Sequence, residues 1–398
     1  MNFVFISPHF PKSYWNFCDR LKKNGVNVLG LADTPYDALP WELKNCLTEY
    51  YKVDNLENYD EVIRAIGYFT HKYGKIDWVE SNNEYWLELD AKIRTDFNIT
   101  TGLKAEEIGS FKSKSAMKSS YKKANVPVAR HHMVNANREE GLAFIAEVGY
   151  PVIVKPDIGV GAAKTYKLKC EEDVHAFYNE LPNIQYIMEE FIEGTIVSFD
   201  GISGNDAEVI FATSNEFPPS IMDIVNTNDH LAYHTVREVS PVLRDCGERV
   251  LKAFNARNRF FHLEFFRLTK AKKGLGEVGD IVALEVNMRA PGGYTPDMIN
   301  YANSVDVYQI WADMVAFGKT YVDLNKQQHY FAAYCARRDG KNYRHSEEEI
   351  WAKYGDRIVM RERMPEILCG AMGNEMYTAK LDTEEDLWEY NDFVLGLA

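Results

Sequence analysis

The sequence lacks the features that mark membrane, secreted and nucleic-acid-binding proteins. No apolar run among its 398 residues approaches the ~20 residues that a membrane-spanning helix needs. Its start, "MNFVFISPHF", has no basic segment and predicts a first strand, not a secretion signal. The six cysteines form no C-x-x-C motif, which is typical of reduced thiols in a cytoplasmic protein. With 45 basic against 59 acidic residues, the net charge of −14 disfavours binding to DNA or RNA. We therefore expect a cytoplasmic protein that acts on small molecules.

The first part of the chain also lacks a dinucleotide fingerprint, although it has the pattern of a parallel α/β unit. Strands are expected at 2–7, 26–32 and 76–81, and helices at about Ser13 to Asn24 and Tyr59 to Tyr73. Strands separated by helices predict a parallel sheet with right-handed crossovers. The first strand is followed by "SPHFPKS" where a nicotinamide-binding unit has G-x-G-x-x-G. We expect a Rossmann-like unit over residues 1–105 that does not bind NAD.

The stretch "ALEVNMRAPGG", residues 283–293, alternates apolar residues with an acid, an amide and a guanidinium group. Because side chains of a strand alternate between its two faces, Glu285, Asn287 and Arg289 share one face. A further acid, Glu264, interrupts the apolar strand "FFHLEFF". Buried carboxylates must be paired, protonated or bound to metal. One interpretation pairs the two acids with Arg267 and Arg289; the other is a divalent cation site, since Mg²⁺ prefers carboxylate and amide oxygens.

A lysine and a glycine-rich loop suggest a place for phosphate. Lys155 ends the apolar run "PVIV", and the loop "DIGVGAAKT" follows it. Its glycines let backbone approach an anion, but the loop is no P-loop because Ala163 precedes Lys164. Further on, "MEEFIEG" predicts a strand that leads into a linker, whose backbone groups suit the rim of an adenine ring. Taken singly, these pieces also fit a surface lysine, a plain turn and an ordinary edge strand.

Taken together and in this order, the pieces resemble the ATP-grasp superfamily of carboxylate–amine ligases over roughly residues 1–320. The order is a lysine near a helix start in "FKSKSAMK", Lys155 with its glycine-rich loop, the "EEFIEG" hinge, a strand glutamate, and Glu-x-Asn-x-Arg. The resemblance implies a mixed α/β and α+β architecture, in which an ATP-grasp fold follows the Rossmann-like parallel-sheet domain. The implied domains are 1–105, an ATP-grasp domain at 106–325 and a small C-terminal α+β subdomain at 326–398. Within 106–325 the glycine-rich lid lies near 150–195 and the metal core at 196–325.

The resemblance also implies roles for individual residues. Lys114 and Lys155 would contact ATP phosphates, with Lys112 and Lys118 as alternatives to Lys114. The lid would include Gly159 and Gly161, and the adenine hinge would comprise Glu189, Glu190, Phe191 and Ile192. The ligands of Mg²⁺ (or Mn²⁺) would be Glu264, Glu285 and Asn287, while Arg289 and Lys155 would be catalytic. Ribose would be held by Glu193 or Asp200, because Ile196 stands where relatives often have a glutamate. Substrates would contact Arg237, Gly292 and Gly293.

The implied activity is ligation of a small-molecule carboxylate to an amine. The γ-phosphoryl group of ATP would pass to the carboxylate, giving an acyl phosphate and ADP, and the amine would then displace phosphate. Two alternatives stay open: an enzyme of the purine-biosynthesis or carbamoyl-phosphate type, and a nucleotide-binding protein without turnover. Relatives are often homodimers, so a dimer is expected by analogy.

Overall fold

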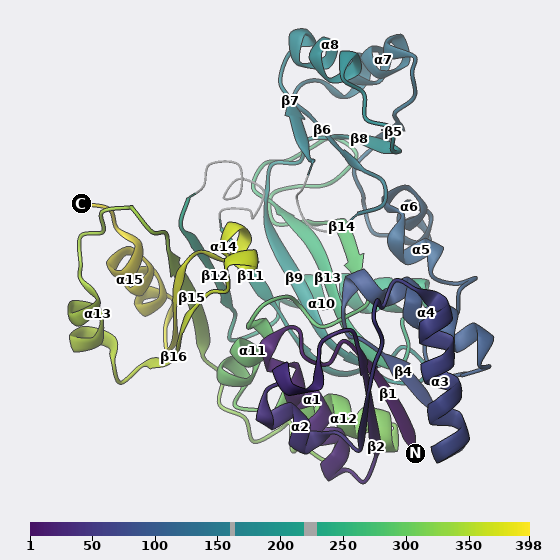
Figure 1. Cartoon of the computed structure of the whole chain (residues 1–398). Helices are drawn as coiled ribbons and strands as arrows, with labels where there is room; N and C mark the ends of the chain where they lie inside the picture. Colours follow the sequence, from purple (N-terminus) through teal and green to yellow (C-terminus); the bar gives the residue numbers. More distant parts are fainter. Residues whose placement is uncertain (160–163, 219–228) are drawn as a thin grey trace.

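Three β-sheets organise the computed structural model, which describes residues 1–159, 164–218 and 229–398. The N-terminal sheet has four strands in the order β3-β2-β1-β4, and a small sheet has the order β5-β8-β6-β7. The large sheet runs β14-β13-β9-β11-β12-β15-β17-β16, with β10 paired to β9. The small sheet projects from the body formed by the other two (Figure 1). Among the described residues, none of the helices combines the length and the apolar character that crossing a bilayer requires.

The N-terminal sheet is parallel, as predicted. Strand β1 (Asn2–Ile6) is buried along its whole length, which explains its continuous apolar run. The other strands are β2 (Asn27–Ala32), β3 (Glu49–Lys52) and β4 (Trp78–Glu80). The helices are α1 (Trp15–Lys23), α2 (Trp41–Cys46), α3 (Tyr59–Tyr73) and α4 (Leu87–Asp96). The predicted helix from Tyr59 to Tyr73 is confirmed, whereas the first helix begins later because a 3₁₀ turn occupies Lys12–Tyr14.

The small sheet is antiparallel and contains the glycine-rich hairpin. Its strands are β5 (His131–Met133), β6 (Val152–Pro156), β7 (Tyr166–Leu168) and β8 (Tyr186–Glu190). Strands β6 and β7 pair on either side of the glycine-rich loop. Helices α7 (Arg138–Val148) and α8 (Glu171–Asn179) pack with this sheet, and their aromatic and aliphatic side chains share its core.

The large sheet extends from the predicted metal strands into the C-terminal tail. It comprises β9 (Gly194–Ser203), β10 (Val209–Thr213), β11 (Asn215–Phe217), β12 (Leu231–Thr235), β13 (Arg259–Leu268), β14 (Ile281–Asn287), β15 (Phe331–Arg337), β16 (Ile358–Arg363) and β17 (Glu375–Leu381). Strand β9 pairs with β10 and strand β13 pairs with β14, both in antiparallel register. Because β12 pairs with β15, the strands of the tail continue the same sheet.

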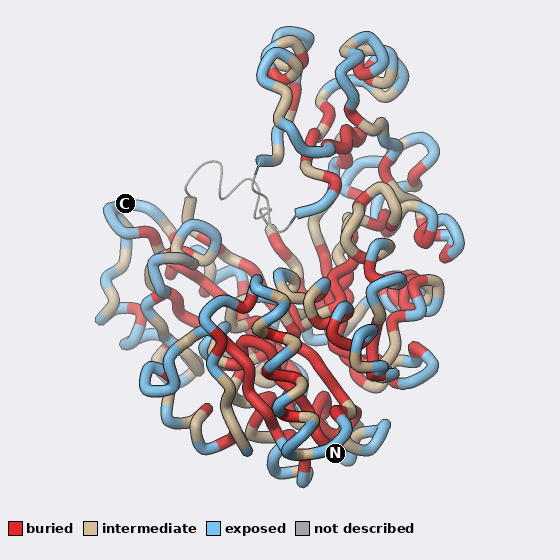
Figure 2. Tube along the Cα trace, turned by 45° about the vertical axis from the view of Figure 1, so that its right-hand side comes forward, coloured by how far each residue is buried: buried red, intermediate tan, exposed pale blue. Residues whose placement is uncertain are grey.

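Helices on the large sheet complete the fold. They are α5 (Gly109–Lys112), α6 (Lys114–Lys123), α10 (Pro241–Phe254), α11 (Thr295–Asn303), α12 (Val307–Phe317), α13 (Glu347–Tyr354), α14 (Glu366–Met372) and α15 (Glu384–Leu395). Helix α12 fastens the N-terminal sheet to the body, because the Trp311 ring packs edge-on against Phe3, Phe5 and Phe17. The buried segments of the N-terminal sheet and of the large sheet lie next to each other in the body of the molecule (Figure 2).

A buried ionic cluster joins the N-terminal sheet to the large sheet. Glu80 ends β4, and its Oε2 accepts hydrogen bonds from Arg94 of α4 at 2.9 Å and Arg259 of β13 at 3.2 Å. All three side chains are almost fully buried. Breaking such a cluster leaves an uncompensated buried charge, so it fixes how β4 and β13 lie relative to each other.

Candidate active site

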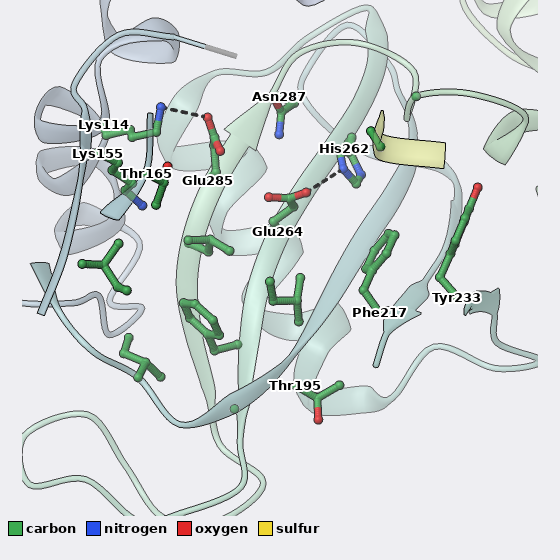
Figure 3. Close-up of a pocket in the computed structure, with 18 of the residues that line it drawn as sticks. Lys114, Lys155, Thr165, Thr195, Phe217, Tyr233, His262, Glu264, Glu285 and Asn287 are labelled. Atoms are coloured by element: carbon green, nitrogen blue, oxygen red, sulfur yellow. Dashed lines mark hydrogen bonds and ion pairs between the residues drawn. The ribbon is translucent and has the colours of Figure 1, made fainter. Parts of the chain in front are cut away.

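A cavity of ≈ 740 Å³ lies where the small sheet faces strands β13 and β14. Its lining comes from β6 and β8 on one side, from β13 and β14 on the other, and from α14 at one end. Glu264, Glu285 and Asn287 extend into it from neighbouring strands, while Lys114 and Lys155 approach from the opposite side (Figure 3). Most of the predicted site residues therefore meet in one place, although they span almost 180 positions of the chain.

Strand register explains how the two acids come together. Strands β13 and β14 are antiparallel, with Glu264 directly opposite Glu285 and His262 directly opposite Asn287. Residues directly opposite in an antiparallel pair point to the same face, and so do residues two apart along one strand. The alternation seen in "ALEVNMR" thus gathers two carboxylates, an amide and an imidazole at one surface of the cavity.

The two carboxyl groups have different electrostatic surroundings. Burial raises the pKa of Glu285; Lys114 opposes this rise, and the carboxylate of Glu264 adds to it. Burial also raises the pKa of Glu264, but the hydrogen bond and charge of His262, together with the charges of Arg289 and Lys155, outweigh burial and the net shift is downward. Like charges held opposite each other disfavour ionisation of one partner. A cation between the two carboxylates would favour the ionised form of both.

The pairing of both acids with arginines, one of the two interpretations of the sequence, is wrong. Arg267 instead binds Glu216, with Nη2 donating to Oε2 at 2.8 Å. Arg289 donates to the carbonyl of Ala290 at 2.9 Å and to Oδ1 of Asn287 at 3.3 Å. Among the described residues, Glu285 has an ion pair with Lys114, whose Nζ lies 3.4 Å from Oε1.

His262 is a site residue that the sequence analysis missed. Its Nε2 lies 3.1 Å from Oε1 of Glu264, and its Nδ1 lies 2.5 Å from Oδ1 of Asp200. Burial lowers the pKa of His262, but Asp200 and Glu264 outweigh burial and raise it to about 9. An imidazolium between two carboxylates orients Glu264 toward the cavity. The signal was present in "FHLEFF", because His262 stands two residues before Glu264 and shares its face of the strand.

The three candidate lysines of the α5–α6 region occupy different places. Lys114 lines the cavity, where its Nζ lies 3.4 Å from the carbonyl oxygen of Gly159. Lys112 donates to the carbonyl of Glu84 at 3.0 Å. Lys118 pairs with the Glu189 carboxylate and donates to the carbonyl of Ala129 at 3.3 Å. Of the three, Lys114 is the one that can reach a ligand in the cavity.

This placement separates the effects of two alanine variants. We expect Lys114→Ala to raise the KM for ATP about tenfold or more, because a buried charge–charge contact is lost while the fold is kept. Lys118→Ala is expected chiefly to lower the free energy of unfolding, because Glu189 loses one of its two cationic partners. Steady-state kinetics and urea unfolding of both variants measure the two effects. A larger KM effect in Lys118→Ala than in Lys114→Ala contradicts the assignment.

The predicted adenine hinge is only partly available to a ligand. The side chain of Glu189 points to Lys155, with Oε2 at 2.7 Å from Nζ. The backbone N–H of Glu190 donates to the carbonyl of Arg130 at 3.1 Å, and Lys272 donates to the carbonyl of Phe191 at 2.5 Å. No described residue forms a hydrogen bond with the backbone N–H or carbonyl of Ile192, which lines the cavity. Ile192 is thus the hinge residue best placed to bind an adenine edge.

The Glu189 carboxylate gives the site a measurable pH signature. Burial raises its pKa, but Lys155 and Lys118 outweigh burial and lower the pKa to about 2. Because the folded pKa lies below the ordinary 4.5, the stabilisation is complete above pH 4.5 and is lost as pH falls toward about 2. Glu189→Gln is expected to lose roughly 3 kcal/mol at pH 7, from about 1.4 kcal/mol per pKa unit.

Chemical unfolding of wild type and Glu189→Gln at several pH values checks this expectation, with Glu139→Gln on the exposed start of α7 as the control. The difference should shrink below pH 4.5. A difference that stays constant down to pH 3 contradicts the ion-pair account.

The remaining predicted residues are placed as follows. Gly159, Gly292 and Gly293 line the cavity, and Gly161 lies outside the described residues. Arg237 does not line it; its Nη1 donates to the carbonyl of Asp382 at 2.5 Å. Of the two ribose candidates, Glu193 lines the cavity, whereas Asp200 is fully buried beneath His262.

The oxygen donors of the cavity suit a metal ion that brings ligands of its own. Among residues 1–159, 164–218 and 229–398, no group of three or more His, Cys, Asp or Glu side chains has an arrangement that could hold a metal on its own. Two carboxylates and an amide oxygen nevertheless fit Mg²⁺, which commonly takes one or two carboxylates and completes its shell with phosphate oxygens and water. The residues present therefore suit a cation that arrives with a nucleotide.

Comparison with known proteins agrees with this geometry. The family model of the ATP-grasp domain matches residues 111–227. An L-arginine-specific L-amino acid ligase of Bacillus subtilis is 23% identical over 347 residues, covering 84% of this chain and 80% of that protein. A phosphoribosylamine–glycine ligase of Clostridium acetobutylicum is 29% identical over 199 residues, 44% of this chain and 45% of that protein. The crystal structure of an L-amino acid ligase from Bacillus licheniformis superimposes with a TM-score of 0.73 at 13% identity, covering 98% and 97% of the two chains.

Residues 111–227 match an ATP-grasp domain, which confirms the resemblance drawn from the sequence. The predicted fold class is confirmed too, with a parallel N-terminal sheet followed by the antiparallel sheets of an ATP-grasp fold. The relatives named above are ligases that form carbon–nitrogen bonds, the enzyme class that the sequence predicted.

Proposed function

We propose that the chain joins an amino acid, through its carboxylate, to an amine and releases ADP and phosphate. The observation that carries this proposal is the convergence of Lys114, Lys155, Glu264, Glu285 and Arg289 on one cavity. A carboxylate and a triphosphate repel each other, so their reaction needs several cations in a small space. The match to the L-amino acid ligase, which spans most of both chains, favours amino acids over the purine-type alternative.

The nucleotide is proposed to lie between the small sheet and β13–β14. Ile192 offers its backbone groups to the adenine edge. The apolar side chains of Ile153 and Phe266 line the same cavity and can pack against the adenine ring. Lys155 and Lys114 then contact the phosphates. Both are already held near carboxylates, Lys155 near Glu189 and Lys114 near Glu285, so their ammonium groups are oriented before ATP binds.

Glu264, Glu285 and Asn287 are proposed to hold Mg²⁺ (or Mn²⁺) that accompanies ATP. When bound there, such a cation would supply positive charge against the phosphate oxygens of ATP. Glu264 is held in place for this role by His262, and Asn287 is oriented by its contact with Arg289.

In the proposed reaction, a carboxylate oxygen of the acid attacks the γ-phosphorus, and the bond to the leaving ADP oxygen breaks. The amine then attacks the acyl carbon, the bond to the phosphate oxygen breaks, and the amine proton passes to solvent. Arg289 donates to the oxygens of the transferring phosphoryl group, since its guanidinium lies at the end of the carboxylate surface. The backbone of Gly292 and Gly293 borders the acid. No nucleophilic side chain is required.

The test is a mixture of the protein, ATP, Mg²⁺ and pooled amino acids and small amines, in which ADP, AMP and phosphate are followed together. We expect ADP and phosphate to appear only with substrates and to be abolished by Glu285→Ala. Splitting the pool then names the pair. Formation of AMP and pyrophosphate would overturn the proposal, as would substrate-independent ADP release.

A further inference from the structure

The cavity has a second end whose lining is chemically unlike the ionic end. We call it the apolar compartment; its walls are Phe217 of β11, Leu231 and Tyr233 of β12, and Leu368, Ala371 and Met372 of α14. None of the described lining residues contributed by β11, β12 or α14 carries a charge. The charged residues of the described lining come from other parts of the chain, among them Lys114, Lys155, Glu264, Glu285 and Arg289.

The strand side of this compartment is preformed. The Tyr233 ring stacks on Phe217 with centroids 5.2 Å apart and an interplanar angle of 18°, and it contacts Tyr334 at 4.8 Å. The Tyr233 hydroxyl and the Thr295 hydroxyl lie 3.0 Å apart and satisfy each other. The phenol is thus occupied within the protein, and the ring face is what Tyr233 offers to a ligand.

The helix side is fixed by the C-terminal strands. Tyr334 of β15 donates to the carbonyl of Met372 at 2.8 Å, and Arg338 donates to the carbonyl of Gly370 at 2.8 Å and to that of Cys369. Arg338 is itself buried. The last turn of α14 is therefore held against the cavity by side chains of the sheet, so its apolar residues form a wall with a set position.

One backbone segment connects the two ends. Arg289 lines the ionic end, and Pro291, Gly292 and Gly293 continue the lining toward α14. At Gly293, a Cβ atom would lie 2.6 Å from Cε of Met372, so the segment and the helix meet closely. A molecule with its carboxylate at Arg289 would therefore have to extend past the two glycines to bring its side chain near Tyr233 and Met372.

We propose that the acid substrate is an amino acid with an uncharged, apolar side chain, which the apolar compartment binds. This inference rests on the proposed ligase function and names its substrate class. A charged side chain would lose its hydration in the compartment and find no partner of opposite charge among its six named residues, which is costly. An aliphatic or aromatic side chain would instead gain contact with these six residues. Amino acids such as leucine, methionine and phenylalanine fit this description; glutamate, lysine and arginine do not.

Two measurements on one panel of acids test the inference. The first is the rate of ADP release with each acid and an excess of pooled amines. The second is calorimetric binding of each acid in the presence of Mg²⁺ and a non-hydrolysable ATP analogue. We expect leucine, methionine and phenylalanine to exceed glutamate, lysine and arginine at least about tenfold in kcat/KM and in affinity.

A charge placed in the wall should reverse this order. Leu368→Glu is expected to lower the affinity and kcat/KM for the apolar acids about tenfold and to raise them for arginine and lysine. Val278→Glu adds the same charge at an exposed position outside the lining and should change nothing. If Leu368→Glu does not fold, Met372→Ala replaces it and is expected to shift the preference toward bulkier apolar acids.

The outcomes separate this inference from the proposed function. Apolar preference in binding without turnover of any acid supports the compartment and contradicts the ligase. Turnover with a preference for charged acids, or binding of no apolar acid, overturns the compartment. A preference confined to the amine overturns the assignment to the acid, and selectivity that is unchanged in the wall variant that folds overturns the location.

Discussion

An Arg289→Ala variant is expected to lose about 100- to 1000-fold in kcat, the range for removing one preorganised donor from a developing negative charge. The KM for ATP should change little, because Lys114 and Lys155 still contact the phosphates. Arg289 is held by the carbonyl of Ala290 and by Asn287, so its guanidinium is oriented before substrates arrive. Steady-state rates of ADP release measure the effect.

Arg289→Lys serves as the close variant. It keeps the charge but loses the planar fork, so an intermediate rate is expected. Arg244→Ala, on the exposed face of α10, removes an arginine outside the cavity and should leave the rate unchanged. If Arg289→Ala raises the KM for ATP and spares kcat, Arg289 binds the ground state and not the transferring group.

A Glu285→Gln variant is expected to lose activity at least about 100-fold, since an amide oxygen is a weaker Mg²⁺ ligand than a carboxylate and even outer contacts of metal sites contribute 10- to 100-fold. The stability of the Glu285→Gln variant, by contrast, should not fall with its activity. Burial raises the pKa of Glu285, so ionisation of this carboxyl lowers the free energy of unfolding as pH rises through its ordinary pKa. Removing the charge should therefore keep or raise the melting temperature.

Glu277→Gln, in the exposed loop between β13 and β14, is the matched control and should leave both properties unchanged. Raised Mg²⁺ concentrations should restore part of the activity of Glu285→Gln. The metal assignment fails if the variant retains wild-type activity at limiting Mg²⁺. A lower melting temperature together with lost activity would instead indicate a structural role for the carboxylate.

Local sequence pattern was enough to find the acidic half of the site. The period of two in "ALEVNMR" set Glu285 and Asn287 on one face, and the pairing of β13 with β14 brought Glu264 opposite. The same rule applied to "FHLEFF" would have included His262. It was missed because a histidine in an apolar strand carries no motif, and its partner Asp200 is 62 residues away.

Contacts between distant segments could not be predicted. The three lysines near α6 are equivalent in sequence, and only the approach of β14 and β8 distinguishes them, with Glu285 facing Lys114 and Glu189 facing Lys118. Pairing of β12 with β15 joins residues about a hundred positions apart, so neither the continuous sheet nor the apolar wall of α14 was visible beforehand.

Transfer of ¹⁸O tests the central claim most directly. Once the substrate pair is known, the acid labelled with ¹⁸O in its carboxylate is turned over with ATP and the amine, and the phosphate is analysed by mass spectrometry. Attack of the carboxylate on the γ-phosphorus predicts one ¹⁸O atom in the inorganic phosphate for each amide bond formed. Unlabelled phosphate, or label found in AMP, would contradict the account.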